Sequence, residues 1–138
     1  MMFPRIDIHS HDTKRADTAI INISPDEVVC PGTYYSMGIH PWDTPAVTQS
    51  MLEALASKVH NEQIVAIGET GLDALKGGNM AKQVELFKFH ILLSEQLEKP
   101  LIIHAVKTFP QIIKLKQELK PRQPWIIHGF RGKPELAQ

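Results

Sequence analysis

Short apolar, β-branched runs recur along the whole chain, and in its second half they alternate with stretches of helical period. The runs predict six strands, at Arg5–His9, Thr18–Ile23, Tyr34–His40, Gln63–Glu69, Leu101–His104 and Trp125–His128. Strands that alternate with helices are typical of a parallel α/β sheet. The fourth and fifth runs are apolar without alternation, which is typical of strands covered on both faces.

Three helical patterns fall between the later strands. Thr44 and Pro45 predict the N-cap and the first residue of one helix. A second helix is predicted over Met80–Glu98, and a third after a Thr108 cap. Lys133–Ala137 has the pattern of the start of a fourth helix.

The first two connections are short for a parallel sheet. Ser10–Asp17 and Ser24–Thr33 contain eight and ten residues and show no helical period. A parallel crossover usually needs a dozen residues or more. Either these crossovers are minimal loops, or the first strands pair differently.

Composition and charge narrow the class of protein. With 138 residues, we expect one domain spanning residues 1–138. Fifteen basic residues balance fifteen acidic ones, which argues against a basic nucleic-acid grip over the whole surface but not against a local one. The single cysteine, Cys30, excludes an internal disulfide framework and fits a reducing compartment. We find no signal-peptide pattern and no apolar run of membrane-spanning length, and therefore expect a cytoplasmic protein with no membrane partner.

Five residues with metal-binding side chains lie at or just after the ends of predicted strands: His9, His11, Glu69, His104 and His128. His9 and His11 are two residues apart, so in an extended chain both imidazoles point to the same side. The carboxyl ends of parallel strands converge at one edge of the sheet, where ligands bind. One such histidine alone is more often structural, but four imidazoles and a carboxylate together suit zinc, manganese or a similar divalent ion.

Five segments of this sequence resemble, in order, the motifs of the TatD-type metal-dependent deoxyribonucleases of the metallo-dependent hydrolase superfamily. They are Ile6–His11, Gly38–Pro41, Ala66–Asp73, Pro100–His104 and Ile127–Gly132, and the resemblance spans essentially the entire chain. His-x-His is shared with other hydrolase families. Gly-Glu-x-Gly-Leu-Asp with Gly-Ile-His-Pro upstream is much more specific.

The resemblance implies a (β/α) barrel with two divalent metal ions, zinc, magnesium or manganese. His9 and His11 would hold one ion, His104 and His128 the other, and Glu69 would bridge the two as the catalytic carboxylate. Such a pair activates a water molecule for attack at phosphorus. The expected activity is cleavage of phosphodiester bonds in DNA.

The resemblance also suggests residues that bind the substrate. His40 would contact a phosphate, the alternative being a turn residue fixed by Pro41. Many family members carry Ser-Arg-Asp after the strand-five histidine, whereas this chain continues to Lys107 without an arginine. Lys107 and Arg131 are the candidate phosphate contacts, the alternative being solvated loop cations. Asp73 belongs to the motif, and we expect it to orient a loop rather than to bind metal.

The chain is short for this fold. A complete barrel needs roughly 200 residues at least, so the predicted fold is α/β of the TIM-barrel type, truncated after about six strands. The family's metal-binding aspartate at the end of the eighth strand is missing. Open sheet edges predict a homo-oligomer or a strand-exchanged assembly. Two alternatives to the DNA-cleaving enzyme stay open: a truncated metal-binding fragment with weak catalysis, and a phosphatase acting on small phosphoesters. Glu69 in place of a lysine disfavours the carbamylated-lysine amidohydrolases.

Overall fold

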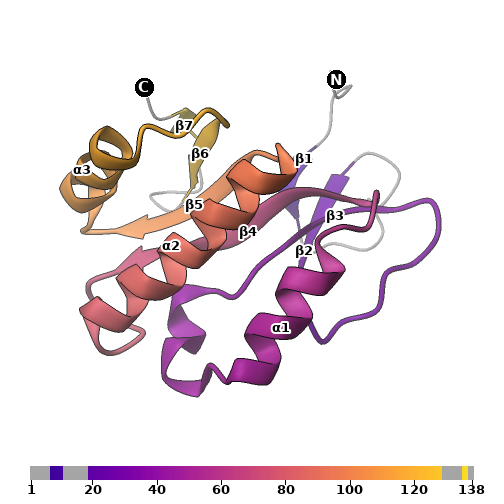
Figure 1. Cartoon of the computed structure of the whole chain (residues 1–138), viewed down its shortest axis with the longest axis horizontal. Coiled ribbons are helices and arrows are strands. Elements are labelled where there is room, and N and C mark those ends of the chain that lie inside the picture. Colours follow the sequence, from indigo (N-terminus) through magenta and orange to yellow (C-terminus); the bar gives the residue numbers. More distant parts are fainter. Residues whose placement is uncertain (1–6, 11–18, 129–134, 137–138) are drawn as a thin grey trace.

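The strands form one sheet whose order follows the chain (Figure 1). The computed structural model describes residues 7–10, 19–128 and 135–136. The strands are β1 (Asp7–Ser10), β2 (Ala19–Ile23), β3 (Tyr34–Met37), β4 (Ile64–Asp73), β5 (Leu101–Val106), β6 (Trp125–His128) and β7 (Glu135–Leu136). β1 to β6 run parallel to one another. An order without reversal is that of a barrel wall rather than of a doubly wound sheet, as predicted.

The six predicted strands are all present, but their ends differ. β3 stops at Met37, before His40, whereas β4 continues four residues beyond Glu69. β5 likewise continues beyond His104. Glu69 and His104 therefore lie inside strands rather than at their ends, which corrects the prediction. The apolar pattern stops early, but the backbone ladder between β4 and β5 continues from Thr70 to Asp73, because main-chain hydrogen bonds do not depend on side-chain polarity.

The short connection between β2 and β3, residues 24–33, is a loop without a helix. β2 pairs in parallel with both β1 and β3, so the alternative pairing of the first strands is excluded. In the β2–β3 ladder, Ile20 to Ile23 face Tyr34 to Met37 without a register shift.

The helices are α1 (Gln49–Lys58), α2 (Met80–Leu97) and α3 (Phe109–Leu119), with a 3-10 helix, η2 (Pro41–Ala46), before α1. The first predicted helix start was wrong. Thr44 lies inside η2, where its hydroxyl donates to the Pro41 carbonyl. The N-cap of α1 is Thr48, which accepts from the Met51 amide. Both threonines precede an apolar periodic stretch, and Pro45 makes Thr44 the stronger local start signal.

The other two predicted helices are confirmed. α2 begins after Asn79, whose side chain accepts from the Lys82 amide, and ends at the left-handed Glu98 before Pro100. α3 begins directly after Thr108. The Thr108 hydroxyl does not cap α3 but donates to the Leu72 carbonyl at 2.8 Å, which ties the end of β5 to β4.

The expected fourth helix is contradicted where the structure describes it. Glu135 and Leu136 form β7, which pairs antiparallel with Ile127 and Ile126 of β6. The reason is that the outer edge of β6 offers unpaired backbone groups, which a passing extended segment satisfies. β6 is therefore not the open edge that the sequence suggested.

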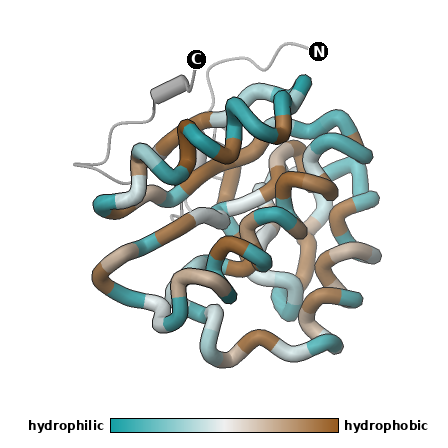
Figure 2. Tube along the Cα trace, turned by 60° about the vertical axis from the view of Figure 1, so that its left-hand side comes forward, coloured by the Kyte–Doolittle hydropathy of each residue, from teal (hydrophilic) through white to brown (hydrophobic). Residues whose placement is uncertain are grey.

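The core lies between the sheet and the helices. α2 runs across β4 and β5 in Figure 1, and in Figure 2 the helices alternate between hydrophobic and hydrophilic segments. Phe87 of α2 packs edge-on against Trp125 of β6, and both side chains are almost fully buried. Within the part of the chain that the structure describes, no helix is long and apolar enough to cross a bilayer.

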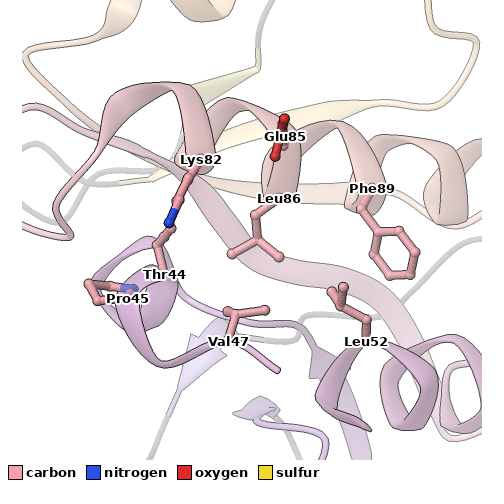
Figure 3. A pocket seen from close by; sticks show the side chains of 8 residues that line it. All are labelled: Thr44, Pro45, Val47, Leu52, Lys82, Glu85, Leu86 and Phe89. Carbon is pink, nitrogen blue, oxygen red and sulfur yellow. The ribbon is translucent and has the colours of Figure 1, made fainter. Parts of the chain in front are cut away.

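A cleft of about 380 Å³ lies on the helical side of the molecule. Its lining residues are Thr44, Pro45, Val47, Leu52, Lys82, Glu85, Leu86 and Phe89, from η2, α1, α2 and the segment between η2 and α1 (Figure 3). Among the residues that the structure describes, none of those that the sequence singled out for chemistry lines this cleft. The candidate site lies elsewhere, on the strands.

Candidate metal centre

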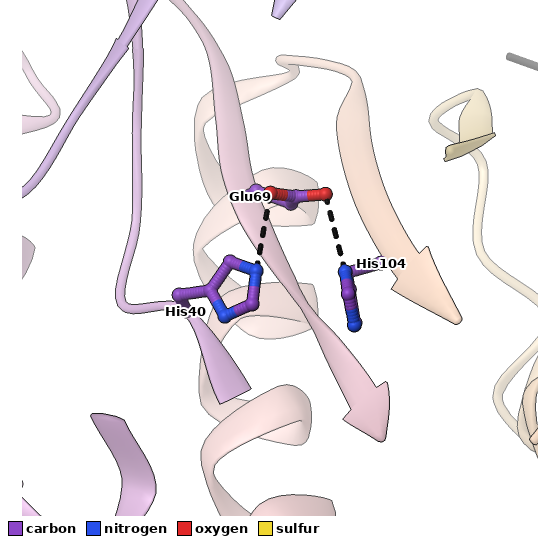
Figure 4. A group of neighbouring side chains, drawn as sticks. All are labelled: His40, Glu69 and His104. Carbon is purple, nitrogen blue, oxygen red and sulfur yellow. Dashed lines mark ion pairs between the residues drawn. The ribbon is translucent and has the colours of Figure 1, made fainter. Parts of the chain in front are cut away.

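Three residues from separate parts of the chain converge at the strands (Figure 4). His40 Nε2 lies 3.3 Å from Glu69 Oε1, and His104 Nδ1 lies 3.6 Å from Glu69 Oε2. One ligand atom from each residue falls within 4.8 Å of the others. Nitrogen and oxygen ligands about 2.1 Å from a tetrahedral metal ion lie about 3.4 Å from each other. The spacing of the three side chains therefore fits a site for a divalent metal ion, and which of them can be a ligand depends on which atom presents a lone pair to the site.

Glu69 is held in place by its backbone and by close strand packing. Its amide donates to Asn22 Oδ1 of β2 at 3.1 Å, and its side chain is only 4% exposed. Two residues further, Gly71 has φ of 142°, and a Cβ there would lie 2.0 Å from the His104 carbonyl oxygen. Only glycine permits this approach, which brings β4 against β5 beside both candidate ligands.

His104 is oriented by Asp73. Its Nε2 lies 2.9 Å from Asp73 Oδ2, and a carboxylate can only accept, so Nε2 carries the proton. The Nδ1 lone pair is then left for a metal ion on the side of Glu69. Carboxylates that fix the tautomer of a ligating histidine in this way recur in metal sites. His104 and Glu69 are therefore well suited to be ligands.

His40 is arranged differently. It precedes η2, and its Nδ1 accepts the Trp42 amide at 3.1 Å. Because a neutral imidazole has one lone pair and one N–H, the proton then sits on Nε2. His40 therefore presents a donor to Glu69 and to the space between them, not a lone pair. This favours contact with an anionic oxygen over metal ligation, and the phosphate contact of His40 stays a prediction.

Trp42 and Asp73 form a hydrogen bond next to the candidate ligands. The Trp42 indole donates its Nε1–H to Asp73 Oδ2 at 2.6 Å. Asp73 Oδ1 accepts from the amides of Leu75 and Lys76, so the carboxylate also orders the following loop as predicted. The contact with His104 was not predicted. Sequence reasoning included Asp73 in the motif but had no signal for its partner, which comes from β5.

These hydrogen bonds shift the pKa values of both partners. Burial by itself lowers the pKa of His104, but its hydrogen bonds and charge interactions with Glu69 and Asp73 raise it above the ordinary value. Burial by itself raises the pKa of Asp73, but the donors Trp42 and His104 and two backbone amides lower it. Asp73 therefore stays ionised and remains an acceptor at neutral pH.

α2 supports the site through two buried polar side chains that the sequence analysis missed. Gln83 Oε1 accepts the Asp73 amide at 2.8 Å, and its Nε2 donates to the Asp73 carbonyl. His90 Nε2 accepts the Ile39 amide at 2.9 Å, next to His40, while Nδ1 donates to the Leu86 carbonyl. His90 has no exposed surface, and burial lowers its pKa to about 4 despite the hydrogen bond to Leu86.

The structure describes the other predicted site residues only in part. His9 lies in β1 and His128 ends β6, where its backbone is in register with His104 of β5. The side chains of His9 and His128 are outside the described residues, as are His11 and Arg131 entirely. Their metal and substrate roles stay predictions. Lys107 is exposed just beyond β5 with φ of 54°, and its phosphate contact also stays a prediction.

The sequence profile of the TatD related DNase family matches residues 6–138. The chain belongs to this family. A metal-dependent hydrolase of Buchnera aphidicola is 39% identical over 97 residues, covering 69% of this chain and 36% of that protein. One from Methanocaldococcus jannaschii is 33% identical and covers 76% of this chain and 41% of that protein. Both proteins are named as uncharacterised metal-dependent hydrolases, so their names give no substrate.

A TatD of Klebsiella pneumoniae named as a 3′-5′ single-stranded DNA and RNA exonuclease is 26% identical, covering 78% of this chain and 41% of that protein. The crystal structure of YjjV, a TatD homologue of Escherichia coli K12, superposes with a TM-score of 0.71 at 23% identity, over 96% of this chain and 62% of that one. That likeness shows the TIM-barrel type of fold. The chain spans about two fifths of the length of these curated relatives.

Proposed function

We propose that this chain carries the metal-binding and substrate-orienting part of a metal-dependent phosphodiesterase that acts on nucleic acid. One observation carries the proposal most directly: Asp73 holds the His104 ring so that Nδ1 faces Glu69 at 3.6 Å. A ring fixed in this tautomer, opposite a buried carboxylate, is what a ligand pair for a divalent ion needs.

The side chains have separate tasks. Glu69 and His104 hold the ion, and His40 donates from Nε2 to a non-bridging phosphate oxygen. A bound divalent ion, when present, supplies an activated water and charge neutralisation at phosphorus. The resemblance adds His9, His11 and His128 as ligands for a two-ion arrangement of zinc, magnesium or manganese. Lys107 and Arg131 are proposed as further phosphate contacts.

The substrate class comes from relatives. TatD proteins of Klebsiella pneumoniae and Edwardsiella piscicida are named as exonucleases of single-stranded DNA and RNA. We extend that class to this chain, with DNA as the expected substrate. The zero formal charge gives no independent support for a nucleic-acid substrate, which makes the direct measurement decisive.

The test combines metal content with turnover. Protein purified without chelator is expected to contain a divalent metal, and to hydrolyse single-stranded DNA with added Mg²⁺, Mn²⁺ or Zn²⁺. Glu69→Gln should abolish turnover and lower metal content, and His104→Ala should lower metal content. Glu85→Gln, an exposed carboxylate on α2, is the matched control and should change neither.

The outcomes separate the alternatives. Bound metal without turnover favours a metal-binding fragment with weak catalysis. Hydrolysis of p-nitrophenyl phosphate but not of DNA favours a small-phosphoester phosphatase. Full turnover in Glu69→Gln contradicts the proposed role of that carboxylate.

A further inference from the structure

An exposed indole stands beside the metal centre. Trp42 is 46% exposed, and its ring centroid lies 4.7 Å from that of His40 and 5.8 Å from that of His104. The other tryptophan, Trp125, is 1% exposed and packs in the core. The indole of Trp42 is thus a large aromatic surface that is open to solvent and lies close to the candidate ligand His104.

The indole is fixed, not free to fold away. Its Nε1–H donates to Asp73 at 2.6 Å, and its own amide donates to His40 Nδ1. These bonds fix the ring at one end and the backbone at the other. A planar group that is already ordered loses little conformational entropy when another planar group stacks on it.

A positive charge accompanies the ring. The Lys76 ammonium lies 4.0 Å from the Trp42 ring centroid, and the Lys76 side chain is exposed. The Lys76 amide donates to Asp73 Oδ1, so the same carboxylate that orients His104 also places this lysine beside the indole. The pair offers an aromatic surface and a mobile cation side by side, next to the place where a phosphate would be cleaved.

We propose that Trp42 and Lys76 form a nucleotide subsite, in which a nucleobase stacks on the indole and the ammonium pairs with a backbone phosphate. This rests on the proposed function, because it names the part of a nucleic-acid substrate that the site recognises beside the metal. It requires the base to displace the ammonium from the ring. An exposed cation–π contact is weaker than base–aromatic stacking, and Lys76 gains a phosphate in exchange.

The proposed subsite predicts a different substrate preference for a nuclease than for a general phosphoesterase. Stacking acts on any base, because every base has a π-face, so the subsite predicts preference for base-bearing substrates with little sequence preference. A small phosphoester without a ring gains nothing from Trp42. The competing explanation is that Trp42 serves only to hold Asp73, and through it His104.

Changing both partners of the stack distinguishes these explanations. The probes are a fluorescein-labelled thymidine hexanucleotide and a labelled abasic hexamer of the same charge. Fluorescence anisotropy measures their binding in the presence of Ca²⁺, and the integrity of the oligomers is checked afterwards. The full chain is expected to bind the thymidine oligomer on the order of tenfold more tightly than the abasic one. Trp42→Leu should remove this preference, whereas Trp42→Phe, which keeps a ring but loses the donor to Asp73, should retain most of it.

Two further variants complete the design. Lys76→Gln should weaken both oligomers, because it removes a phosphate contact and not the ring. Tyr34→Leu removes a 50% exposed aromatic ring at the start of β3, away from the site, and should leave both affinities unchanged. Binding of the thymidine oligomer should also quench the fluorescence of exposed Trp42, while buried Trp125 changes little.

The proposal is overturned if the wild-type chain binds both oligomers equally or binds neither, or if Trp42→Leu weakens both by the same factor. Unchanged affinities in Lys76→Gln would remove the lysine from the subsite. The proposed function fails separately. If the chain shows the Trp42-dependent preference but hydrolyses no DNA with any metal, the subsite stands and the proposed function is wrong. If the chain hydrolyses DNA without the preference, the proposed function stands and the subsite is wrong.

Discussion

His104 Nε2 and Asp73 Oδ2 lie 2.9 Å apart, and this contact decides which ring nitrogen of His104 faces Glu69. The two residues are 31 positions apart and meet because β4 and β5 are parallel neighbours. Asp73 is itself held by Gln83 through its backbone and by Trp42 through its side chain. The orientation of a candidate metal ligand thus depends on contacts from η2, β4 and α2.

We expect Asp73→Asn to weaken divalent-metal binding by about 10- to 100-fold, since the carboxylate that fixes the His104 tautomer is lost. Isothermal titration with Zn²⁺ or Mn²⁺ measures the affinity, and circular dichroism checks the fold. Asp43→Asn, an exposed carboxylate in η2, is the matched control. Unchanged affinity in Asp73→Asn would show that His104 needs no such orientation.

We expect His40→Gln to leave metal content within about twofold of wild type while weakening substrate binding. The reason is that Nδ1 of His40 already accepts the Trp42 amide, which leaves Nε2 as a donor. His104→Ala, in contrast, should lower metal content. Elemental analysis of both variants gives the comparison, and a parallel loss of metal in His40→Gln would make His40 a ligand.

We expect the free energy of unfolding to fall as the pH drops from about 6.5 to about 4, owing to His90. Its pKa is lowered to about 4 in the fold from 6.5, so the unfolded chain binds a proton in this window that the folded chain does not. The stability from a neutral His90 is present above pH 6.5 and falls by about 1.4 kcal/mol per pH unit toward pH 4. The ionised Asp73, with its lowered pKa, adds a loss only below about pH 4.

Urea unfolding at pH 6.5, 5.5 and 4.5 measures this slope. His90→Gln keeps a polar side chain near the Ile39 amide but does not titrate, so its stability should vary less between these pH values. The exposed His60→Gln is the control and should keep the wild-type slope. Equal slopes in wild type and His90→Gln would assign the pH dependence to other groups.

We expect Gly71→Ala to cost several times more stability than Gly32→Ala. Both glycines have positive φ, but a Cβ at Gly71 would lie 2.0 Å from the His104 carbonyl oxygen, whereas nothing lies within 4 Å at Gly32. A positive φ alone costs a non-glycine residue on the order of 1–3 kcal/mol at either position. Thermal unfolding compares the variants, and a similar shift in Tm would mean that β4 and β5 separate without cost. Metal binding should also weaken in Gly71→Ala, because His104 must move.

Local patterns were sufficient for most of the elements. Apolar runs located the strands, and the cap and proline signals located α2 and α3 to within a residue or two. They misplaced the start of α1, because Thr44 followed by Pro45 is the stronger local start signal, whereas the helix begins after Thr48. They also ended β4 at Glu69, because the pairing of Thr70–Asp73 with β5 depends on a neighbour that a local pattern does not contain.

The sequence by itself determined the parallel α/β architecture, the TatD family and the choice of Glu69 and His104 as candidate ligands. These follow from periodicity and from motifs that lie within a few residues along the chain. The tertiary structure decided how those ligands are oriented. The Trp42–Asp73–His104 chain joins η2, β4 and β5, and His90 of α2 supports the loop before η2. Hydrogen bonds between residues 31 to 51 positions apart form only once the sheet order and the helix packing bring their donors and acceptors together.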